Sequence, residues 1–204
     1  MFEEGMYGNF EINQKIKLAL KMKPLFPLFF ARNTLIVAKE LLGKIIEVNG
    51  CRARIVEVEA YKDDEASHAF TKTDRSVLMY DTFSHVYVYL IYGMYNCLNF
   101  TTEKNGIPGA VLIRGLEPLS GIEKMQKRRN TLEIKNLCSG PGKLCQALGI
   151  DKKFNESKMG DKLKVFDDGF VVNKIGKSKR VGISVATHLE WRFFIEGNKF
   201  VSKH

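Results

Sequence analysis

The feature that most constrains the fold is the segment 82–102, which contains no Asp, Glu, Lys or Arg. Its length would suffice for a membrane span, but tyrosine, asparagine and glycine run through its middle, where a bilayer makes such residues costly. Residues 86–91 are β-branched, aromatic or aliphatic, which is typical of a strand, and residues 95–101 provide a partner after a short turn. The segment therefore predicts a buried β-hairpin in a protein without membrane contact.

The net charge suggests a polyanionic partner. The chain has 32 basic and 23 acidic side chains among 204 residues, a net charge of +9. Such an excess favours nucleic acid, an acidic membrane surface or an anionic substrate, although a generally basic proteome would give the same number. The length fits one domain or two small ones, and an apolar content of 45% is enough for a core.

The cysteines and the first residues carry no sign of metal binding or secretion. The cysteines at 51, 97, 138 and 145 form no CxxC pair and accompany no histidine cluster, so neither a metal nor a cofactor is expected. Met1-Phe2-Glu3-Glu4 lacks the basic and apolar regions of a secretion signal. Reduced thiols in a cytoplasmic protein are expected.

Caps and turns place the first elements. Residues 1–24 are expected to form an N-terminal arm and residues 25–204 a single domain. Asn33 suits the N-cap of a helix over 34–42, and Asn49-Gly50 suits the turn between strands at 44–48 and 51–60. Further strands are expected at 86–91, 95–101, 110–114, 163–166, 170–172, 181–185 and 191–195, and further helices at 118–130 and from a Ser139 cap to Gly149. Hairpins with inserted helices predict an α+β fold with a largely antiparallel sheet.

The strand Ile55–Tyr61 contains two glutamates. Alternation along a strand places Glu57, Glu59 and Tyr61 on one face. That face could be the solvated acidic side of a half-buried strand. Alternatively, a carboxylate buried beside an aromatic ring would have a raised pKa suited to general acid–base catalysis. The segment by itself leaves both interpretations open.

Tyrosines are concentrated in the predicted hairpin. Tyr87 and Tyr89 share one strand face, where tyrosine most often packs within the sheet. Tyr92 stands at the tip beside Gly93, where its own fold would bury it poorly, and such a ring suits insertion between stacked bases as a wedge. Tyr61 and Tyr89 could offer aromatic faces to an extruded base.

The segment Cys138–Cys145 reads Cys-Ser-Gly-Pro-Gly-Lys-Leu-Cys and opens a predicted helix. Free N–H groups at a helix start, with Lys143 alongside, would cradle a phosphate, although the spacing is not that of a nucleotide P-loop. Many helices that begin in this way bind nothing. The basic residues at 124–129 are interpreted as a solvated helix face rather than a phosphate grip.

Six segments carry a more specific signal: Ile55–Tyr61, Ser67–Phe70, Tyr87–Tyr95, Asn99, Val111–Arg114 and Ser139–Leu148. In this order and spacing they resemble the alkyladenine (3-methyladenine) DNA glycosylase family, over residues 34–202. The resemblance implies a single mixed domain with a curved antiparallel sheet, surrounding helices and a protruding, DNA-inserting β-hairpin. It also implies a monofunctional enzyme that hydrolyses the N-glycosidic bond of a damaged purine and leaves an abasic site.

The resemblance assigns roles to residues of the active site. Glu59 matches the carboxylate that deprotonates the attacking water, and Arg114 matches the arginine that helps to hold it. Tyr61, His68 and Tyr89 match the rings that stack around the flipped base. Because the glycosidic bond breaks through a cation-like sugar, a nearby carboxylate activates water and stabilises the positive charge. Aromatic faces favour a cationic alkylated purine.

Other matched positions concern DNA. Asn99 matches the asparagine that clashes with the 2-amino group of normal guanine, and Tyr92 matches the residue that intercalates into the duplex. Positions near the DNA backbone or groove are matched by Met94, Tyr95, Lys143 and Lys152. The expected partner is duplex DNA with damaged purines (3-methyladenine, 7-methylguanine, hypoxanthine or ethenoadenine), bound by a monomer. In a bacterium, the enzyme is expected in the cytoplasm with the nucleoid.

Two other functions stay open. A non-catalytic damaged-DNA-binding protein would use the same surface but would need neither Glu59 nor Arg114. A carbohydrate hydrolase would use Glu57 and Glu59 as a pair, since residues two apart on a strand lie roughly 6.5–7 Å from each other, within the inverting range. Glu57 is interpreted here as structural, bonded to backbone or to a basic side chain.

Overall fold

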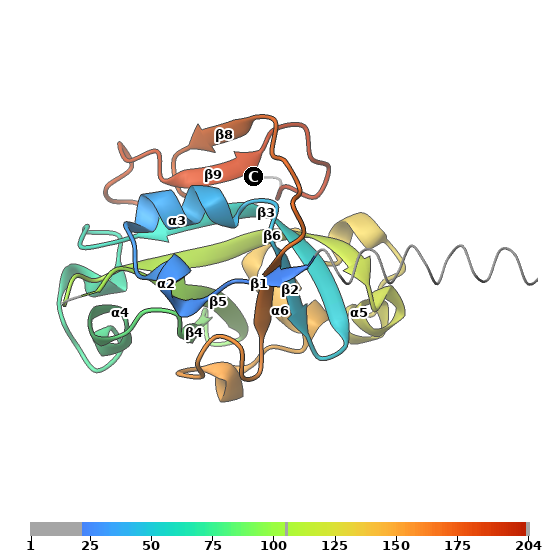
Figure 1. The fold of residues 1–204 in the computed structure, drawn as a ribbon, viewed down its shortest axis with the longest axis horizontal. Coiled ribbons are helices and arrows are strands. Elements are labelled where there is room, and N and C mark those ends of the chain that lie inside the picture. Colours follow the sequence, from blue (N-terminus) through green and yellow to red (C-terminus); the bar gives the residue numbers. More distant parts are fainter. Residues whose placement is uncertain (1–21, 105, 203–204) are drawn as a thin grey trace, which may run out of the picture.

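A computed structural model of the chain describes residues 22–104 and 106–202. Within these residues, one antiparallel sheet of nine strands has the order β1-β7-β2-β3-β6-β5-β4, and β9 joins it through β3 while β8 pairs with β9. The sheet is strongly curled and five α-helices surround it (Figure 1). The expected α+β fold with a curved antiparallel sheet is confirmed.

The strands are β1 (Lys23–Pro24), β2 (Ile45–Val48), β3 (Cys51–Tyr61), β4 (Val86–Ile91), β5 (Tyr95–Thr101), β6 (Ala110–Ser120), β7 (Lys164–Asp167), β8 (Ile175–Ser178) and β9 (Arg192–Ile195). The α-helices are α2 (Pro27–Phe30), α3 (Thr34–Leu41), α4 (Val77–Asp81), α5 (Ile122–Arg129) and α6 (Pro141–Leu148), and short 3-10 turns lie at His68–Phe70, Ile134–Asn136 and Lys152–Phe154. Of the expected N-terminal arm, residues 1–21 lie outside the described residues, and Lys23–Pro24 pairs with β7.

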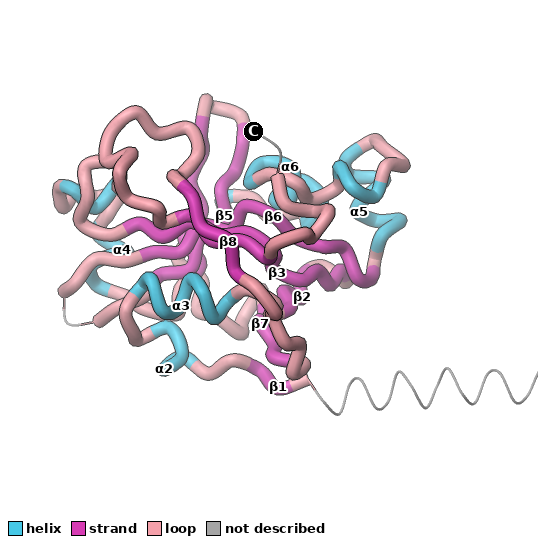
Figure 2. The backbone as a smooth tube through the Cα atoms, turned by 90° about the horizontal axis from the view of Figure 1, so that it is seen from above, coloured by secondary structure: helices cyan, strands magenta, loops and turns pink. Residues whose placement is uncertain are grey.

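Strand β3 lies at the centre of the molecule. It pairs with β2 and β9 on one edge and with β6 on the other, with an irregular register between Ile55 and Val58. Helices α2 and α3 lie on one side of the sheet and α5 and α6 on the other (Figure 2). Glu57 and Glu59 on this strand are fully buried, so the interpretation of their face as solvated is wrong.

Local signals correctly predicted several ends and turns. The Asn33 side chain accepts a hydrogen bond from Leu35 N at the start of α3. Asn49 and Gly50 have the positive φ angles, 51° and 72°, that this hairpin turn requires. Helix α6 ends at Gly149, whose φ is 67°.

Other predicted elements were wrong. The N-cap of α6 is Gly140 rather than Ser139, which instead forms a β-bridge with Gly115. Strand β6 continues to Ser120, so the predicted helix at 118–130 begins only at Ile122. Residues 170–172 and 181–185 are not strands, because the segment that pairs with β9 is Ile175–Ser178.

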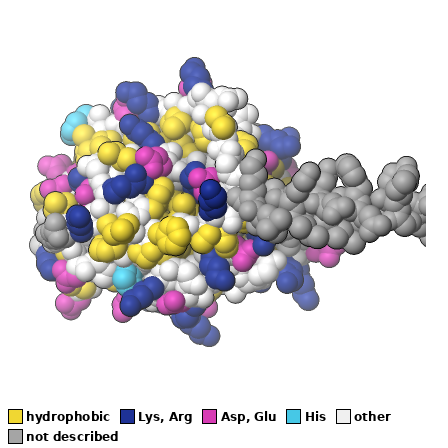
Figure 3. Space-filling view, viewed as in Figure 1, with side chains coloured by type: hydrophobic (Ala, Val, Ile, Leu, Met, Phe, Trp, Pro, Cys, Tyr) yellow, Lys and Arg dark blue, Asp and Glu magenta, His cyan; other side chains and the backbone are white. Residues whose placement is uncertain are grey.

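The excess positive charge is not gathered on the face seen in Figure 3. Lys and Arg side chains there are interspersed with acidic and apolar ones (Figure 3). In the described ranges, no helix is long and apolar enough to cross a membrane. Charge therefore marks no binding site on this face, and the site is located from the cavities.

Candidate active site

A cavity of about 260 Å³ opens between β3, β4, β5, β6 and the loop at 181–183. Five of the predicted site residues line it: Tyr61, His68, Tyr89, Asn99 and Arg114. They come from four strands and a 3-10 turn. The curl of the sheet therefore brings together residues that are widely separated in the sequence.

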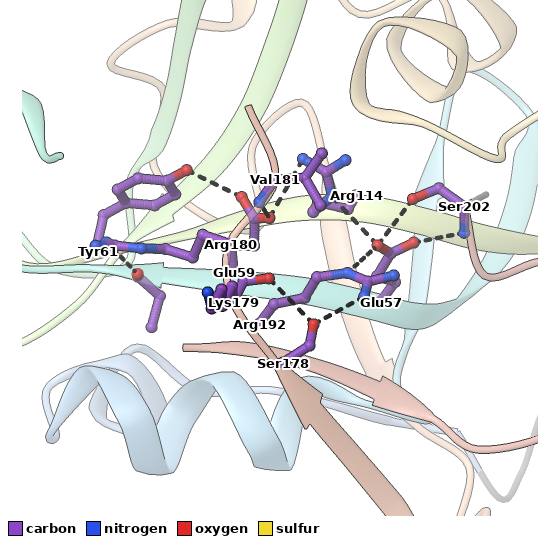
Figure 4. A network of polar contacts seen from close by, with 11 residues as sticks. Glu57, Glu59, Tyr61, Arg114, Ser178, Lys179, Arg180, Val181, Arg192 and Ser202 are labelled. Atoms are coloured by element: carbon purple, nitrogen blue, oxygen red, sulfur yellow. Dashed lines mark hydrogen bonds and ion pairs between the residues drawn. The ribbon is translucent and has the colours of Figure 1, made fainter. Parts of the chain in front are cut away.

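Glu59 lies behind the residues that line this cavity and has no exposed surface. Its carboxylate accepts hydrogen bonds from Tyr61 Oη (2.9 Å) and Val181 N (2.7 Å), and Arg114 Nη1 lies 3.4 Å from Oε1 (Figure 4). All three partner residues line the cavity. Burial raises the pKa of the Glu59 carboxyl, although Arg114 and the two hydrogen bonds oppose the rise. This arrangement fits a general base.

Glu57 has a different environment two residues away. Its carboxylate accepts hydrogen bonds from Ser202 N (2.7 Å), Ser202 Oγ (2.8 Å), Arg192 Nε (2.7 Å) and Arg114 Nε (3.2 Å) (Figure 4). Burial by itself would raise the pKa of Glu57, but the Ser202, Arg192 and Arg114 contacts together lower it. Glu57 is thus a structural anion, as its interpretation from the sequence stated, and the carboxylate pair of a carbohydrate hydrolase is not formed.

Arg114 connects the two carboxylates. Its Nε contacts Glu57 and its Nη1 contacts Glu59, while only 9% of its side chain is exposed. Because Glu57 holds one edge of the guanidinium, the other edge is fixed toward Glu59 and the cavity. A planar, permanently charged fork is well suited to this bridging position.

Aromatic rings form one wall of the cavity. The His68 ring lies 4.6 Å from the Tyr89 ring in an edge-to-face arrangement, and His68 Nδ1 is 2.9 Å from Tyr87 Oη. Burial, together with the charge of Arg75, lowers the pKa of His68 to about 4, so the imidazole is neutral at pH 7. The wall is therefore a neutral stacking surface.

Asn99 lies on β5 and lines the cavity. Its Nδ2 donates to the backbone oxygens of Tyr87 (3.1 Å) and Cys97 (3.2 Å). These two bonds fix the orientation of the amide, which is buried. A rigid group in this place can exclude a substituent from the cavity by steric clash.

The tip of the β4–β5 hairpin is exposed. Tyr92 is 79% and Met94 66% exposed, and Tyr95 is half exposed. Tyr92 has a φ of 52°, in the left-handed region that residues other than glycine rarely adopt. Backbone strain of this kind is concentrated at functional sites, and an exposed ring held in this way is available to a partner.

A groove of about 460 Å³ adjoins the cavity and is lined by Tyr92, Tyr95, Lys143 and the start of α6. Gly142 packs closely there, because a Cβ at this position would lie 3.1 Å from the Tyr95 ring, which would have to shift by a few tenths of an ångström. Lys143 Nζ is 3.4 Å from Asn136 Oδ1. The structure thus joins the hairpin tip and the helix start into one surface beside the cavity.

Lys152 lies apart from this groove. It lines a larger hollow of about 560 Å³ on the outer side of β4, together with Arg75 and the acidic residues Asp74, Asp81 and Glu156. Arg75 and Tyr89 line both this hollow and the cavity of about 260 Å³ described above. The predicted DNA-contacting residues therefore form two separate groups.

Sequence reasoning missed the residues that the loop at 179–190 contributes. Arg180 is buried, donates to Ala60 O (3.1 Å) and pairs with Asp64, and its guanidinium lies 4.7 Å from the centre of the Tyr61 ring. Val181 supplies the N–H that binds Glu59. The loop has no periodic pattern, so no signal in the sequence could have found these contacts.

Within the described ranges, no group of three or more His, Cys, Asp or Glu side chains is arranged to hold a metal ion. The four cysteines are buried and unpaired. Cys97 lines the cavity, and burial raises the pKa of its thiol to about 11. It is therefore protonated at pH 7 and a poor nucleophile.

Comparisons with known proteins agree with this fold and site. The model of the methylpurine-DNA glycosylase (MPG) family matches residues 28–199. A protein of Clostridium perfringens (strain SM101 / Type A) named "Putative 3-methyladenine DNA glycosylase" is 46% identical over 198 residues, which covers 86% of this chain and 97% of the relative. Proteins of the same name from Clostridium acetobutylicum and Rhizobium johnstonii are 44% and 46% identical, covering 85% and 86% of this chain and 95% and 87% of the relatives.

These matches make the protein a monofunctional DNA N-glycosylase. Within that class, the chain belongs to the methylpurine-DNA glycosylase family. The alternative of a non-catalytic DNA-binding protein is therefore set aside.

Proposed function

We propose that the enzyme excises alkylated purines, 3-methyladenine and 7-methylguanine, and also hypoxanthine and ethenoadenine, from duplex DNA. The observation that carries the proposal is the buried Glu59 carboxylate, bonded to Tyr61, Arg114 and Val181, all three of which line a cavity. A flipped nucleotide would place its sugar near this carboxylate and its base among the aromatic rings.

In the proposed reaction, Glu59 removes a proton from a water molecule as the water oxygen bonds to C1′ of the sugar. The C1′–N bond breaks and its electron pair leaves with the base. Arg114 helps to hold the water, and the negative charge of Glu59 stabilises the cation-like sugar of the transition state. No covalent enzyme intermediate forms, so the product is an abasic site.

We propose that the cavity selects damaged bases by stacking and by steric exclusion. Tyr61, His68 and Tyr89 offer ring surfaces to the base, and a cationic alkylpurine gains roughly 0.5–2 kcal/mol from a well-placed ring. Asn99, whose amide is held by two backbone oxygens, excludes the 2-amino group of normal guanine. The cavity thereby distinguishes lesions from the large excess of normal bases.

We assign DNA binding to the hairpin tip and the start of α6. Tyr92 fills the gap left by the flipped nucleotide and offsets part of the cost of unstacking. Met94 and Tyr95 contact the neighbouring groove, and Lys143 and Lys152 bind phosphates and make affinity salt-dependent. The proposal describes a monomer that acts in the cytoplasm and needs no metal.

The decisive experiment is excision from a methylated duplex by Glu59→Gln protein, detected as strand cleavage at abasic sites. Loss of a positioned general base lowers rates by about 10²–10⁴-fold, so we expect a loss of that size. Glu65→Gln, the same change at an exposed position in the segment that follows β3, serves as the control and should retain full activity. Full excision by Glu59→Gln would refute the mechanism.

A further inference from the structure

Arg75 and Arg114 line the cavity and Arg180 lies over the Tyr61 ring, and the charges of these three arginines are compensated differently. Arg114 contacts Glu57 and Glu59, at 3.2 and 3.4 Å. Arg180 forms a two-point contact with Asp64 at 2.5 and 3.0 Å. Arg75 forms no ion pair with any carboxylate in the described part of the chain. Arg75 therefore differs from Arg114 and Arg180 in having no carboxylate in direct contact, and Asp74, Asp81 and Glu156 line only the outer hollow that it shares.

Contacts with the aromatic wall hold Arg75 beside the cavity. Its guanidinium lies 5.2 Å from the centre of the Tyr89 ring, and its charge opposes the rise that burial causes in the pKa of Tyr87. It also lines the cavity itself. Its charge is thus fixed beside the ring on which, under the proposed function, the flipped base stacks.

We propose that Arg75 is a specificity-determining residue that biases excision toward neutral lesions and away from cationic ones. The inference rests on the proposed function of the cavity. The charge of Arg75 would favour excision of bases that lack the positive charge on which cation–π stacking depends.

The direction of this bias follows from the charge of the departing base, which takes the electron pair of the broken bond. When the C1′–N bond of a neutral base such as hypoxanthine breaks, the electron pair makes the departing base an anion, which then takes a proton from solvent. The base of a cationic 7-methylguanine departs as a neutral molecule. A fixed positive charge stabilises the first leaving group, and it also disfavours entry of the second base in its cationic form.

The test compares single-turnover excision of hypoxanthine and of 7-methylguanine from duplexes of one sequence, with enzyme in saturating excess. We expect Arg75→Gln to lower the ratio of the hypoxanthine rate to the 7-methylguanine rate by about tenfold, the effect of one solvent-exposed charge roughly 7 Å away at an effective dielectric constant of about 35. Arg75→Lys, which keeps the charge, should retain most of the wild-type ratio. Arg75 is exposed, so both variants should fold.

Arg32→Gln is the matched control. Arg32 lies 4.6 Å from the centre of the Phe29 ring, much as Arg75 lies over Tyr89, but it pairs with Glu40 and lines none of the cavities described above. Its variant changes the net charge by the same amount and should leave the ratio unchanged.

Two results would overturn the inference. An equal fall of both rates in Arg75→Gln would mean that Arg75 binds only phosphate, and a ratio in Arg75→Lys as low as that in Arg75→Gln would exclude a charge effect. If wild-type protein excises neither lesion, the proposed function fails and the inference fails with it. If the wild type excises both and the ratio does not respond to Arg75→Gln, the inference alone fails.

Discussion

Glu57 and Glu59 are two residues apart on one strand, and both are fully buried, yet their environments shift their pKa values in opposite directions. Glu57 is surrounded by donors from Arg114, Arg192 and Ser202. Glu59 has fewer donors, and they line a cavity. A buried carboxylate that is fully paired stabilises a fold, whereas one that is partly paired beside a cavity can take up a proton.

Removing the charge of Glu57 should have the largest effect on stability. Glu57→Gln leaves Arg192 and part of Arg114 buried without their anion, and breaking a buried pair in this way costs about 3–5 kcal/mol of unfolding free energy. Urea titration of the variant, beside wild type and Glu65→Gln, measures this cost. A loss below about 1 kcal/mol would mean that Glu57 is not the anion that holds the cluster together.

The acid limb of the pH–rate profile should report Glu59. The carboxylate must be ionised to accept the water proton, and burial raises its pKa, so excision of 7-methylguanine should rise with pH through a midpoint above 4.5. Tyr61→Phe removes a donor to the ionised form. The midpoint should therefore move to higher pH, by about one unit for a hydrogen bond of about 1.4 kcal/mol.

Tyr89→Phe is the control for this shift, because the described contacts of Glu59 include no hydrogen bond from Tyr89. The excision rate of this variant can differ from that of the wild type, but the midpoint of its pH–rate profile should equal the wild-type midpoint. A midpoint that moves equally in both variants would assign the acid limb to a group other than Glu59.

The smallest expected effect is that of Glu59→Gln on stability. The pKa of Glu59 is raised in the folded protein, so the ionised carboxyl destabilises the fold at pH values above its ordinary pKa. A neutral amide relieves this cost, and Arg114 keeps Glu57 as a partner. The unfolding free energy should change by less than about 1 kcal/mol. A loss as large as that of Glu57→Gln would remove the distinction between the two carboxylates.

Much of the site could be predicted because its residues lie on elements with strong local signals. Glu59 and Tyr61 lie on a strand with a clear pattern, and Tyr89 and Tyr92 lie on a hairpin set off by the uncharged segment. Resemblance to a family of known chemistry then assigned their roles, including that of His68. The loop at 179–190 was missed because irregular backbone carries no periodicity, and a strand was predicted at 181–185 in its place.

The sequence by itself determined the hairpins, the helix ends at Asn33 and Gly149, and the strand that carries both glutamates, because these depend on neighbouring residues. Resemblance to a family assigned the role of base to Glu59, and only the tertiary structure showed that the two glutamates have different surroundings. Ser202 and Arg192 reach Glu57, and Val181 reaches Glu59, from positions more than 100 residues away in the chain. A carboxylate's pKa depends on what surrounds it in space, and local sequence does not contain that information.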